Sequence, residues 1–218
     1  MAEENIYFKD RKDAGQKLAD AVLKYKGITN VVVYALPRGG VVTGKEVAKK
    51  LGCPLDILII RKIGHPSFQE YAIGAISEKG NAVFNEIELQ SIDEKWLDAE
   101  IEKKKEEAKL KREIYFKNRR PINPEGKIAI IVDDGVATGL TMSAAIKEIK
   151  TNKPEKIIVA VPVAPKEFID SIKKDIDELI VLYIPEIFLG AVGAYYENFN
   201  QVSDQEVLTL IKKFTPTS

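Results

Sequence analysis

The stretch Ile130–Thr141, IIVDDGVATGLT, decides the fold that this sequence predicts. A run of apolar residues leads into two adjacent carboxylates, Asp133 and Asp134, and then into small residues and the pattern Thr-Gly-x-Thr. The segment Leu140–Ile149 follows with helical spacing, so we expect a buried strand that enters a helix through a tight loop. Small residues let backbone N–H groups converge and a helix start adds further donors, which together favour an anion.

The acidic pair indicates what surrounds that anion. A carboxylate cannot face a phosphate, but it can accept hydrogen bonds from the vicinal hydroxyls of a sugar. The loop therefore predicts a holder for a pentose 5-phosphate. A helix N-cap after a strand would need one Asp rather than two followed by Gly-x-x-Thr-Gly. The Gly-Lys-Ser/Thr ending of a P-loop is absent.

Apolar strands that alternate with helical segments extend in both directions from this loop. The expected strands are Ile28–Leu36, Leu55–Ile60, Lys127–Val132, Ile157–Val161 and Glu178–Tyr183. Continuous apolar strands alternating with helices such as Val41–Leu51 predict an α/β fold, a mainly parallel sheet with helices on both faces. In such a sheet ligands bind beyond the carboxyl ends of the strands.

Two further loops are expected at the same edge. Pro37-Arg38-Gly39-Gly40 follows the first strand, where successive glycines expose amides and Arg38 offers a fork of donors to phosphate. A tight turn would explain the glycines but not the arginine. Arg61 and Lys62 follow the second strand, and this location favours anion binding over a merely solvated pair.

Three segments lie outside the predicted sheet. Asp10–Tyr25 has the pattern of an amphipathic helix with Asp10 as its cap. Ala72–Phe84 predicts a hairpin that turns at Lys79-Gly80-Asn81. Ile92–Lys117 predicts a long helix rich in i,i+4 pairs of opposite charge, for which a solvated face is favoured over a nucleic-acid arm.

Composition excludes several classes of protein. The 218 residues are 45% hydrophobic and 30% charged with zero formal net charge, which is typical of a globular protein without a field for nucleic acid or membranes. Cys53 is the one cysteine and His65 the one histidine, so an internal disulfide and His-rich zinc sites are excluded. The polar N-terminus and the lack of an apolar run of membrane-spanning length predict a cytoplasmic protein.

The decisive stretch resembles the phosphoribosyl-diphosphate signature of type I phosphoribosyltransferases, and strand order extends the likeness from Ile28 to Tyr183. The stretches ALPRGGV, IIRKIGHP, EYAIGAI and YYENFNQVSD are similar to a bacterial and archaeal group known as predicted phosphoribosyltransferases. The resemblance implies a Rossmann-like fold and one domain over residues 1–218. Its core is expected at about 28–185, a small hood at 1–27 and 186–218, and an insertion at about 72–120.

The resemblance also implies a role for each loop in binding 5-phosphoribosyl 1-diphosphate. The 5-phosphate is bound by Gly135, Val136, Ala137, Thr138, Gly139, Leu140 and Thr141. The ribose hydroxyls are bound by Asp133 and Asp134, which also reach Mg²⁺ through water. The diphosphate loop consists of Pro37, Arg38, Gly39 and Gly40.

Arg61 and Lys62 resemble the basic pair of orotate and adenine phosphoribosyltransferases, which implies catalytic groups that lead into a mobile loop, here Ile63–Tyr71. This loop contains His65, either as a lid residue or as a bystander. It departs from the orotate type because GHPSFQEY has no additional lysine.

The implied reaction is displacement of diphosphate from the ribose C1 by a nitrogenous base or related acceptor, in a cytoplasmic homodimer that uses Mg²⁺. Neither a nucleic-acid nor a membrane partner is expected. The acceptor is expected at the hood, where the aromatic residues either stack on a base or pack in the core. These residues are Phe188, Tyr195, Tyr196 and Phe199.

Two other functions remain open at this point. One is a regulatory protein that senses phosphoribosyl diphosphate and contacts nucleic acid through Lys103–Lys105 and through Arg119 and Arg120. The other is a hydrolase that uses the Asp pair as nucleophile and acid. Adjacent residues at a strand end point apart, which disfavours the hydrolase.

Overall fold

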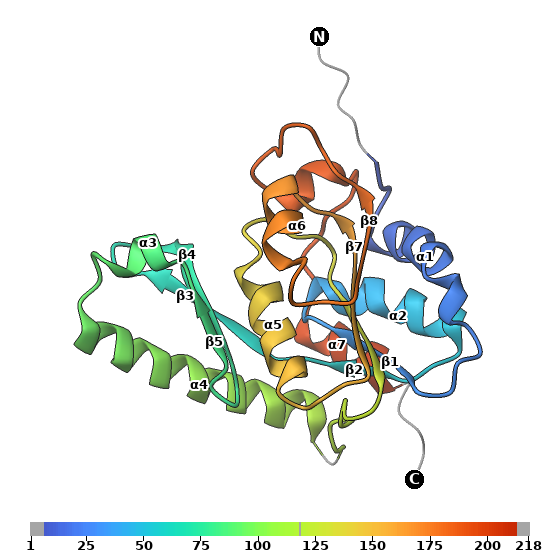
Figure 1. Ribbon diagram of the computed structural model, residues 1–218, viewed down its shortest axis with the longest axis horizontal. Coiled ribbons are helices and arrows are strands. Elements are labelled where there is room, and N and C mark those ends of the chain that lie inside the picture. The colour runs from blue at the N-terminus through green and yellow to red at the C-terminus, as the bar shows by residue number, and fades with distance from the viewer. Residues whose placement is uncertain (1–6, 118, 213–218) are drawn as a thin grey trace.

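A five-stranded parallel sheet forms the centre of the computed structural model, which describes residues 7–117 and 119–212 (Figure 1). Its strands are β1 (Val31–Ala35), β2 (Leu55–Ile57), β6 (Ile128–Val132), β7 (Lys156–Val163) and β8 (Glu178–Tyr183). They pair in the order β2-β1-β6-β7-β8, and every pairing is parallel. The predicted α/β fold is thereby confirmed, and each expected core segment contains one strand of this sheet.

Helices cover both faces of this sheet, which is why β1 and β6 are buried along their whole length. One face packs against α1 (Arg11–Ala21), α2 (Gly39–Leu51) and α7 (Asp204–Lys212). The other packs against α5 (Leu140–Lys150) and α6 (Lys166–Ile172). Alternation of side chains divides β1 between the two clusters, with Val33 on the first and Tyr34 on the second.

A second, antiparallel sheet projects from the core as an arm (Figure 1). It consists of β3 (Ile60–His65), β4 (Phe68–Ser77) and β5 (Ala82–Phe84) in that order, followed by α3 (Glu86–Leu89) and α4 (Glu94–Phe116). Ile63, Ile73 and Ile76 pack against the α4 residues Trp96 and Ile101. The predicted hairpin is confirmed, and β4 begins four residues before the expected segment.

Two predictions at the start of the arm were wrong. The apolar run Leu55–Ile60 is not one strand, because β2 ends at Ile57 and Ile60 begins β3 in the other sheet. The run stays apolar across the crossing, so its pattern does not reveal the break. The expected loop Ile63–Tyr71 is mostly strand, since β3 continues to His65 and β4 begins at Phe68.

The helix caps follow the sequence closely. Asp10 accepts a hydrogen bond from the Asp13 backbone N–H at 2.8 Å and so caps α1 as predicted. The side chain of Asp93 caps α4 by accepting from the Trp96 backbone N–H, also at 2.8 Å. Two 3₁₀ helices complete the elements: η1 (Leu23–Tyr25) and η2 (Val192–Tyr195). No helix within the described ranges has the length and apolar character needed to cross a bilayer.

Candidate functional site

The loop between β6 and α5 presents a concave row of backbone donors. The N–H groups of Ala137, Thr138 and Gly139 donate to no residue that the structure describes. The hydroxyls of Thr138, which is exposed, and Thr141, which is half-buried, likewise have no hydrogen-bond partner in the described part of the chain. The first turn of α5 follows directly and adds its own free N–H groups. This arrangement suits a tetrahedral anion.

Glycine is required at Gly139 for two separate reasons. Its φ of 81° lies in the left-handed region, where a side chain is strained. A Cβ there would also lie 2.3 Å from the ring of Phe168 on α6. Gly139 therefore lets the loop turn into α5 while it packs directly on α6.

The Pro37–Gly40 loop lies directly against the acidic pair. A Cβ on Gly39 would lie 1.8 Å from Asp134 Oδ2, and a Cβ on Gly40 would lie 2.7 Å from Asp133 Oδ1. The two glycines thus allow the backbone of one loop to touch the carboxylates of the other, in addition to the expected exposure of amides. The structure brings these two predicted loops together at the carboxyl edge of the parallel sheet.

Arg11 holds the carboxylate of Asp134, a contact that the sequence did not predict. Its Nε donates to Asp134 Oδ2 at 2.6 Å, and the two side chains are only 11% and 15% exposed. A second donor, Arg11 Nη1, reaches the carbonyl oxygen of Asn200 at 2.6 Å. The guanidinium lies 3.6 Å above the ring of Phe199. Arg11 therefore joins α1, the C-terminal segment and the acidic loop at one point.

The ionised form of Asp133 is disfavoured in this setting. Burial of the carboxyl group and the negative charge of Asp134 raise the pKa of Asp133 well above its usual value. A hydrogen bond from the Asp134 backbone N–H to Asp133 Oδ1, at 2.8 Å, and the positive charge of Lys62 oppose this shift. The positive charge of Lys62 thus favours the ionised form of Asp133.

Arg61 and Lys62 lie on consecutive positions of β3, so their side chains point to opposite faces of the strand. Arg61 turns toward α4 and donates to Glu107 Oε2 through Nε at 3.1 Å and Nη2 at 2.6 Å. Burial opposes ionisation of Glu107, but hydrogen bonds from Lys104 and Arg61 lower its pKa overall. The structure therefore places the two residues of the predicted basic pair on different sides of β3.

A basic cavity of about 520 Å³ adjoins the Pro37–Gly40 loop. Its charged lining is Arg38, Arg61 and Lys111, beside Tyr115. Arg38 is exposed, and its guanidinium has no hydrogen-bond partner among the described residues. Lys111 and Tyr115 both bond to Asp204 of α7. Sequence reasoning found Arg38 and Arg61 but not Lys111, because nothing in the pattern of α4 distinguishes it from the other lysines.

The aromatic residues of the expected hood mostly pack on each other. Tyr195 and Tyr196 are buried in one cluster with Phe8, and the Tyr196 hydroxyl donates to the Asp134 carbonyl at 2.6 Å. Phe199 lies 4.8 Å from the ring of Tyr196 and beneath Arg11. Packing is therefore the observed role of Tyr195 and Tyr196, and through them the hood supports the acidic loop.

The one histidine, His65, and the one cysteine, Cys53, both have structural roles. His65 Nδ1 accepts from the Ser67 backbone N–H at 3.1 Å in the turn between β3 and β4. Burial raises the pKa of Cys53 to about 11, so its thiol is packed rather than poised as a nucleophile. Within the described ranges, no three His, Cys, Asp or Glu side chains gather closely enough to enclose a metal ion.

Asp133→Asn is expected to raise the melting temperature at neutral pH, by roughly 1 to 2 kcal/mol in unfolding free energy. The folded state raises the pKa of Asp133. The stability that the protonated Asp133 carboxyl contributes is therefore fully present below the pKa of Asp133 in the unfolded chain. This stability is lost as the pH rises through the pKa of Asp133 in the folded protein. The neutral amide avoids this loss and still accepts from the Asp134 N–H.

Thermal melts of both proteins between about pH 4.5 and 7.5 measure the difference. The advantage of the variant should shrink toward the acidic end. Asp170→Asn, at an exposed aspartate on α6, is the matched control and should show no such gain. A constant difference across the pH range, or a loss of stability at pH 7.5, would contradict the electrostatic account of Asp133.

Comparison with known proteins agrees with this geometry. The family model described as the phosphoribosyl transferase domain matches residues 4–197. A curated Mycobacterium tuberculosis protein (strain H37Rv) that is named as a phosphoribosyl transferase is 40% identical over 208 residues. The alignment covers 94% of this chain and 46% of that protein, so the chain spans about half the length of this relative.

Solved structures show the same fold. A crystal structure of a Thermus thermophilus protein superimposes with a TM-score of 0.79 at 38% identity, covering 95% of this chain and 98% of the other. A Neisseria gonorrhoeae protein solved with bound ppGpp has a TM-score of 0.51 at 15% identity, covering 95% and 96%, and shares the fold alone. Because the family model spans most of the chain, the chain belongs to the phosphoribosyl transferase family.

Proposed function

We propose that the protein transfers the 5-phosphoribosyl group of 5-phosphoribosyl 1-diphosphate to a nitrogenous base or a related acceptor and releases diphosphate. One observation carries the proposal: a row of free backbone donors follows an acidic pair, and the Pro37–Gly40 loop that touches this pair also lines a cavity with three cations. These groups match, in order, a phosphate, a ribose with vicinal hydroxyls and a diphosphate. Membership of the phosphoribosyl transferase family supports the same chemistry.

Each predicted residue receives a place in this scheme. The residues from Gly135 to Thr141 bind the 5-phosphate, and Asp133 and Asp134 accept hydrogen bonds from the ribose hydroxyls. The Pro37–Gly40 loop, with Arg38 extending into the basic cavity, binds the diphosphate together with Arg61 and Lys111. Lys62 lies on the opposite face of β3 and balances the charge of the acidic pair.

The reaction requires little acid–base chemistry. The bond between ribose C1 and the diphosphate oxygen breaks, and its electron pair leaves on the diphosphate. The lone pair of the acceptor nitrogen forms the new bond to C1 with inversion, and the proton that this nitrogen carried passes to water. Negative charge grows on the leaving group, so cations fixed around the diphosphate lower the barrier.

The carboxylates present fit a role for Mg²⁺. This ion is bound in proteins by one or two carboxylates together with substrate phosphates and water. Asp133 and Asp134 provide such oxygens, while the described chain offers no cluster of three acidic side chains that would hold a metal by itself. When bound with the substrate, Mg²⁺ would neutralise charge on the diphosphate. Burial raises the pKa of Asp133, and a bound cation would oppose this shift by favouring the ionised carboxylate.

We further propose that the chain works as one unit in the cytoplasm and forms a homodimer. The hood at 7–27 and 186–212 and the arm contribute to the same site as the core, as the contact of Arg11 with Asp134 illustrates. The acceptor would enter where the hood meets the acidic loop.

Most of the basic residues expected to contact nucleic acid, Arg120 excepted, are paired with acidic residues of the described chain, which weighs against the regulatory alternative. Lys103 and Lys105 pair with Glu100 and Glu102 on α4 itself, and Arg119 pairs with Asp56. The expected nucleic-acid contacts are thus largely neutralised. The hydrolase alternative is also disfavoured, because Asp133 and Asp134 are adjacent residues at a strand end and their side chains point apart.

A screen of purine, pyrimidine and related nitrogen acceptors with phosphoribosyl diphosphate and Mg²⁺ tests the proposed reaction. Diphosphate release that depends on one acceptor class is the expected result. Lys111→Ala should slow that release about tenfold or more by removing one cation from the diphosphate subsite. Release of phosphate from generic esters, with no acceptor-dependent diphosphate, would overturn the assignment.

A further inference from the structure

Asp204, the first residue of α7, contacts two side chains that line the basic cavity. Its Oδ2 accepts from Lys111 Nζ at 2.5 Å, and its Oδ1 accepts from the hydroxyl of Tyr115. Both partners belong to α4 and lie one helical turn apart, on the same face of that helix. The hydrogen bonds of Asp204 therefore affect the basic cavity through these two side chains.

The start of α7 is capped without Asp204. Ser203 Oγ accepts from the Glu206 backbone N–H at 3.2 Å, and Glu206 Oε2 accepts from the Ser203 backbone N–H at 2.7 Å. This reciprocal pair is a capping box. The helix dipole favours an acidic residue in the first turn, but it does not explain why that residue binds two donors of another helix. Hydrogen bonds from Lys111 and Tyr115 lower the pKa of Asp204, so the carboxylate stays ionised.

Lys111 is the cation whose position depends on this contact. One N–H donor of its ammonium group bonds to Asp204, and no other described residue accepts from the rest, which are left to a ligand in the cavity. A lysine side chain without such a contact samples many rotamers, and ordering it reduces the affinity for a ligand. Arg61 is held in a similar way by Glu107. A carboxylate thus orients each of these two cations before a ligand arrives.

Tyr115 is fixed as a wall of the cavity by the same carboxylate. Its side chain is only 5% exposed. Burial and the hydrogen bond to Asp204 raise the pKa of Tyr115, while the positive charges of Arg38 and Arg61 oppose this shift. The hydroxyl therefore remains protonated and keeps donating to Asp204, which holds the ring in place.

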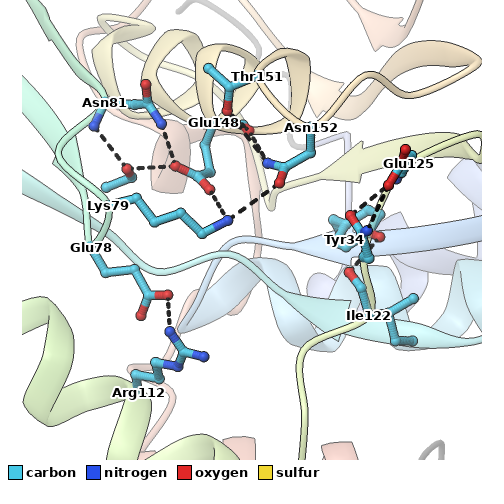
Figure 2. Close-up of polar contacts among 12 residues, drawn as sticks. Tyr34, Glu78, Lys79, Asn81, Arg112, Ile122, Glu125, Glu148, Thr151 and Asn152 are labelled. Carbon is cyan, nitrogen blue, oxygen red and sulfur yellow. Dashed lines mark hydrogen bonds and ion pairs between the residues drawn. The ribbon is translucent and has the colours of Figure 1, made fainter.

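The backbone of α4 is held by other contacts beside the one to Asp204. Arg112 Nη1 donates at 2.6 Å to Oε1 of Glu78, in the turn between β4 and β5 (Figure 2). The same turn is bound to α5, where Glu148 Oε2 accepts from Asn81 Nδ2 at 2.6 Å (Figure 2). Loss of the Asp204 carboxylate would therefore release two side chains without releasing the helix that carries them.

We propose that Asp204 is a positioning residue for the proposed diphosphate subsite, where it orients the Lys111 ammonium group and the Tyr115 ring toward a diphosphate. The inference rests on the proposed function, because it names a residue that prepares the same site. The carboxylate also brings negative charge near the cavity, which by itself opposes the binding of an anion. Orientation and charge act in opposite directions, so the sign of the change in affinity distinguishes them.

Calorimetry with inorganic diphosphate and, separately, with ribose 5-phosphate tests this role in the presence of Mg²⁺. Asp204→Ala is expected to weaken diphosphate binding about tenfold, although it removes a repelling charge. The affinity for ribose 5-phosphate should stay unchanged, because Asp204 bonds to α4 and not to the loop 133–141. Asp204→Asn should retain most of the diphosphate affinity, since the amide can accept from Lys111 and donate to the Tyr115 oxygen.

Glu178→Ala is the matched control. Glu178, at the start of β8, also accepts from a tyrosine hydroxyl and a lysine ammonium group, those of Tyr25 at 2.6 Å and Lys24 at 2.8 Å. Its loss should leave both affinities unchanged. In protein that already carries Lys111→Ala, adding Asp204→Ala should weaken diphosphate binding less than it does alone, because the effect passes through Lys111.

A diphosphate affinity of the Asp204→Ala variant equal to or above that of the unsubstituted protein would overturn the proposal. An equal loss of affinity for both ligands would do the same, because it would indicate a general loosening of the fold. Failure of the proposed function gives a different result. If the unsubstituted protein binds neither inorganic diphosphate nor phosphoribosyl diphosphate, the proposed function fails and this inference fails with it. If it binds both and Asp204→Ala weakens neither, only the role of Asp204 is refuted.

Discussion

Protein that carries Asp133→Asn and Asp134→Asn is expected to lose about 100-fold or more of its affinity for phosphoribosyl diphosphate while remaining folded. Both substitutions remove charge from groups that would accept hydrogen bonds from ribose hydroxyls and reach Mg²⁺. The fold should survive because each asparagine retains an oxygen in the same position. The amide that replaces the Asp133 carboxylate can still accept from the backbone N–H of residue 134, and the amide at position 134 can still accept from Arg11.

Calorimetry in the presence of Mg²⁺ measures the affinity, and circular dichroism with a thermal melt checks the fold. The matched control carries Asp170→Asn and Asp175→Asn, which change net charge equally at two exposed aspartates on α6 and just after it. Its affinity should equal that of the unsubstituted protein. An unchanged affinity in the Asp133 and Asp134 variant would refute the assignment of this loop to the ribose phosphate.

Much of the parallel core was predictable because buried strands carry their signal locally. Its five strands lie in short apolar runs, and a helix follows three of them, β1, β6 and β7, as in Lys127–Val132 before Leu140–Ile149. Side-chain burial on both faces makes such runs continuous rather than alternating. The rule that ligands bind at the carboxyl edge of a parallel sheet then brought the Pro37–Gly40 and Asp133–Thr141 loops together correctly.

The arm was less predictable because its sheet begins within an apolar run that also ends β2. Leu58 still donates its backbone N–H to the Ala35 carbonyl at 3.0 Å, and two residues later Ile60 pairs with Ser77 in the other sheet. The loop that the resemblance implied at Ile63–Tyr71 is instead mostly strand on both sides of Gly64. A Cβ there would lie 2.2 Å from the Gln69 carbonyl oxygen, so the glycine permits close strand pairing around a register shift.

The contact of Arg11 with Asp134 was missed for a different reason. The two residues are 123 positions apart, and helix periodicity indicates only which face of α1 is buried, not what a residue in its first turn will meet. One signal was present in the sequence: YYENFNQVSD contains Phe199 and Asn200, which hold the guanidinium of Arg11. This run of aromatic and amide residues outside the core therefore contains groups that support the acidic loop through Arg11.

Arg11→Ala is expected to weaken binding of phosphoribosyl diphosphate about tenfold or more and to lower unfolding free energy by about 3 kcal/mol. Removing one partner of a largely buried pair leaves Asp134 uncompensated beside Asp133 and next to an incoming diphosphate. Loss of the donor to Asn200 and of the stacking on Phe199 loosens the C-terminal segment. A melting temperature lower by roughly 6 to 12 °C is expected for a chain of this length.

Arg11→Lys separates positioning from simple stability. Lysine keeps a positive charge near Asp134 but offers no planar fork for Asp134 and Asn200 together. It should recover part of the melting temperature while the affinity for phosphoribosyl diphosphate stays reduced, because the orientation of the Asp134 carboxylate is not restored. Lys17→Ala, six residues further along α1 at an exposed position that does not contact the acidic pair, is the control and should change neither quantity by much. If the affinity and the melting temperature fall in parallel across all three variants, Arg11 stabilises the fold and does not position the acidic pair.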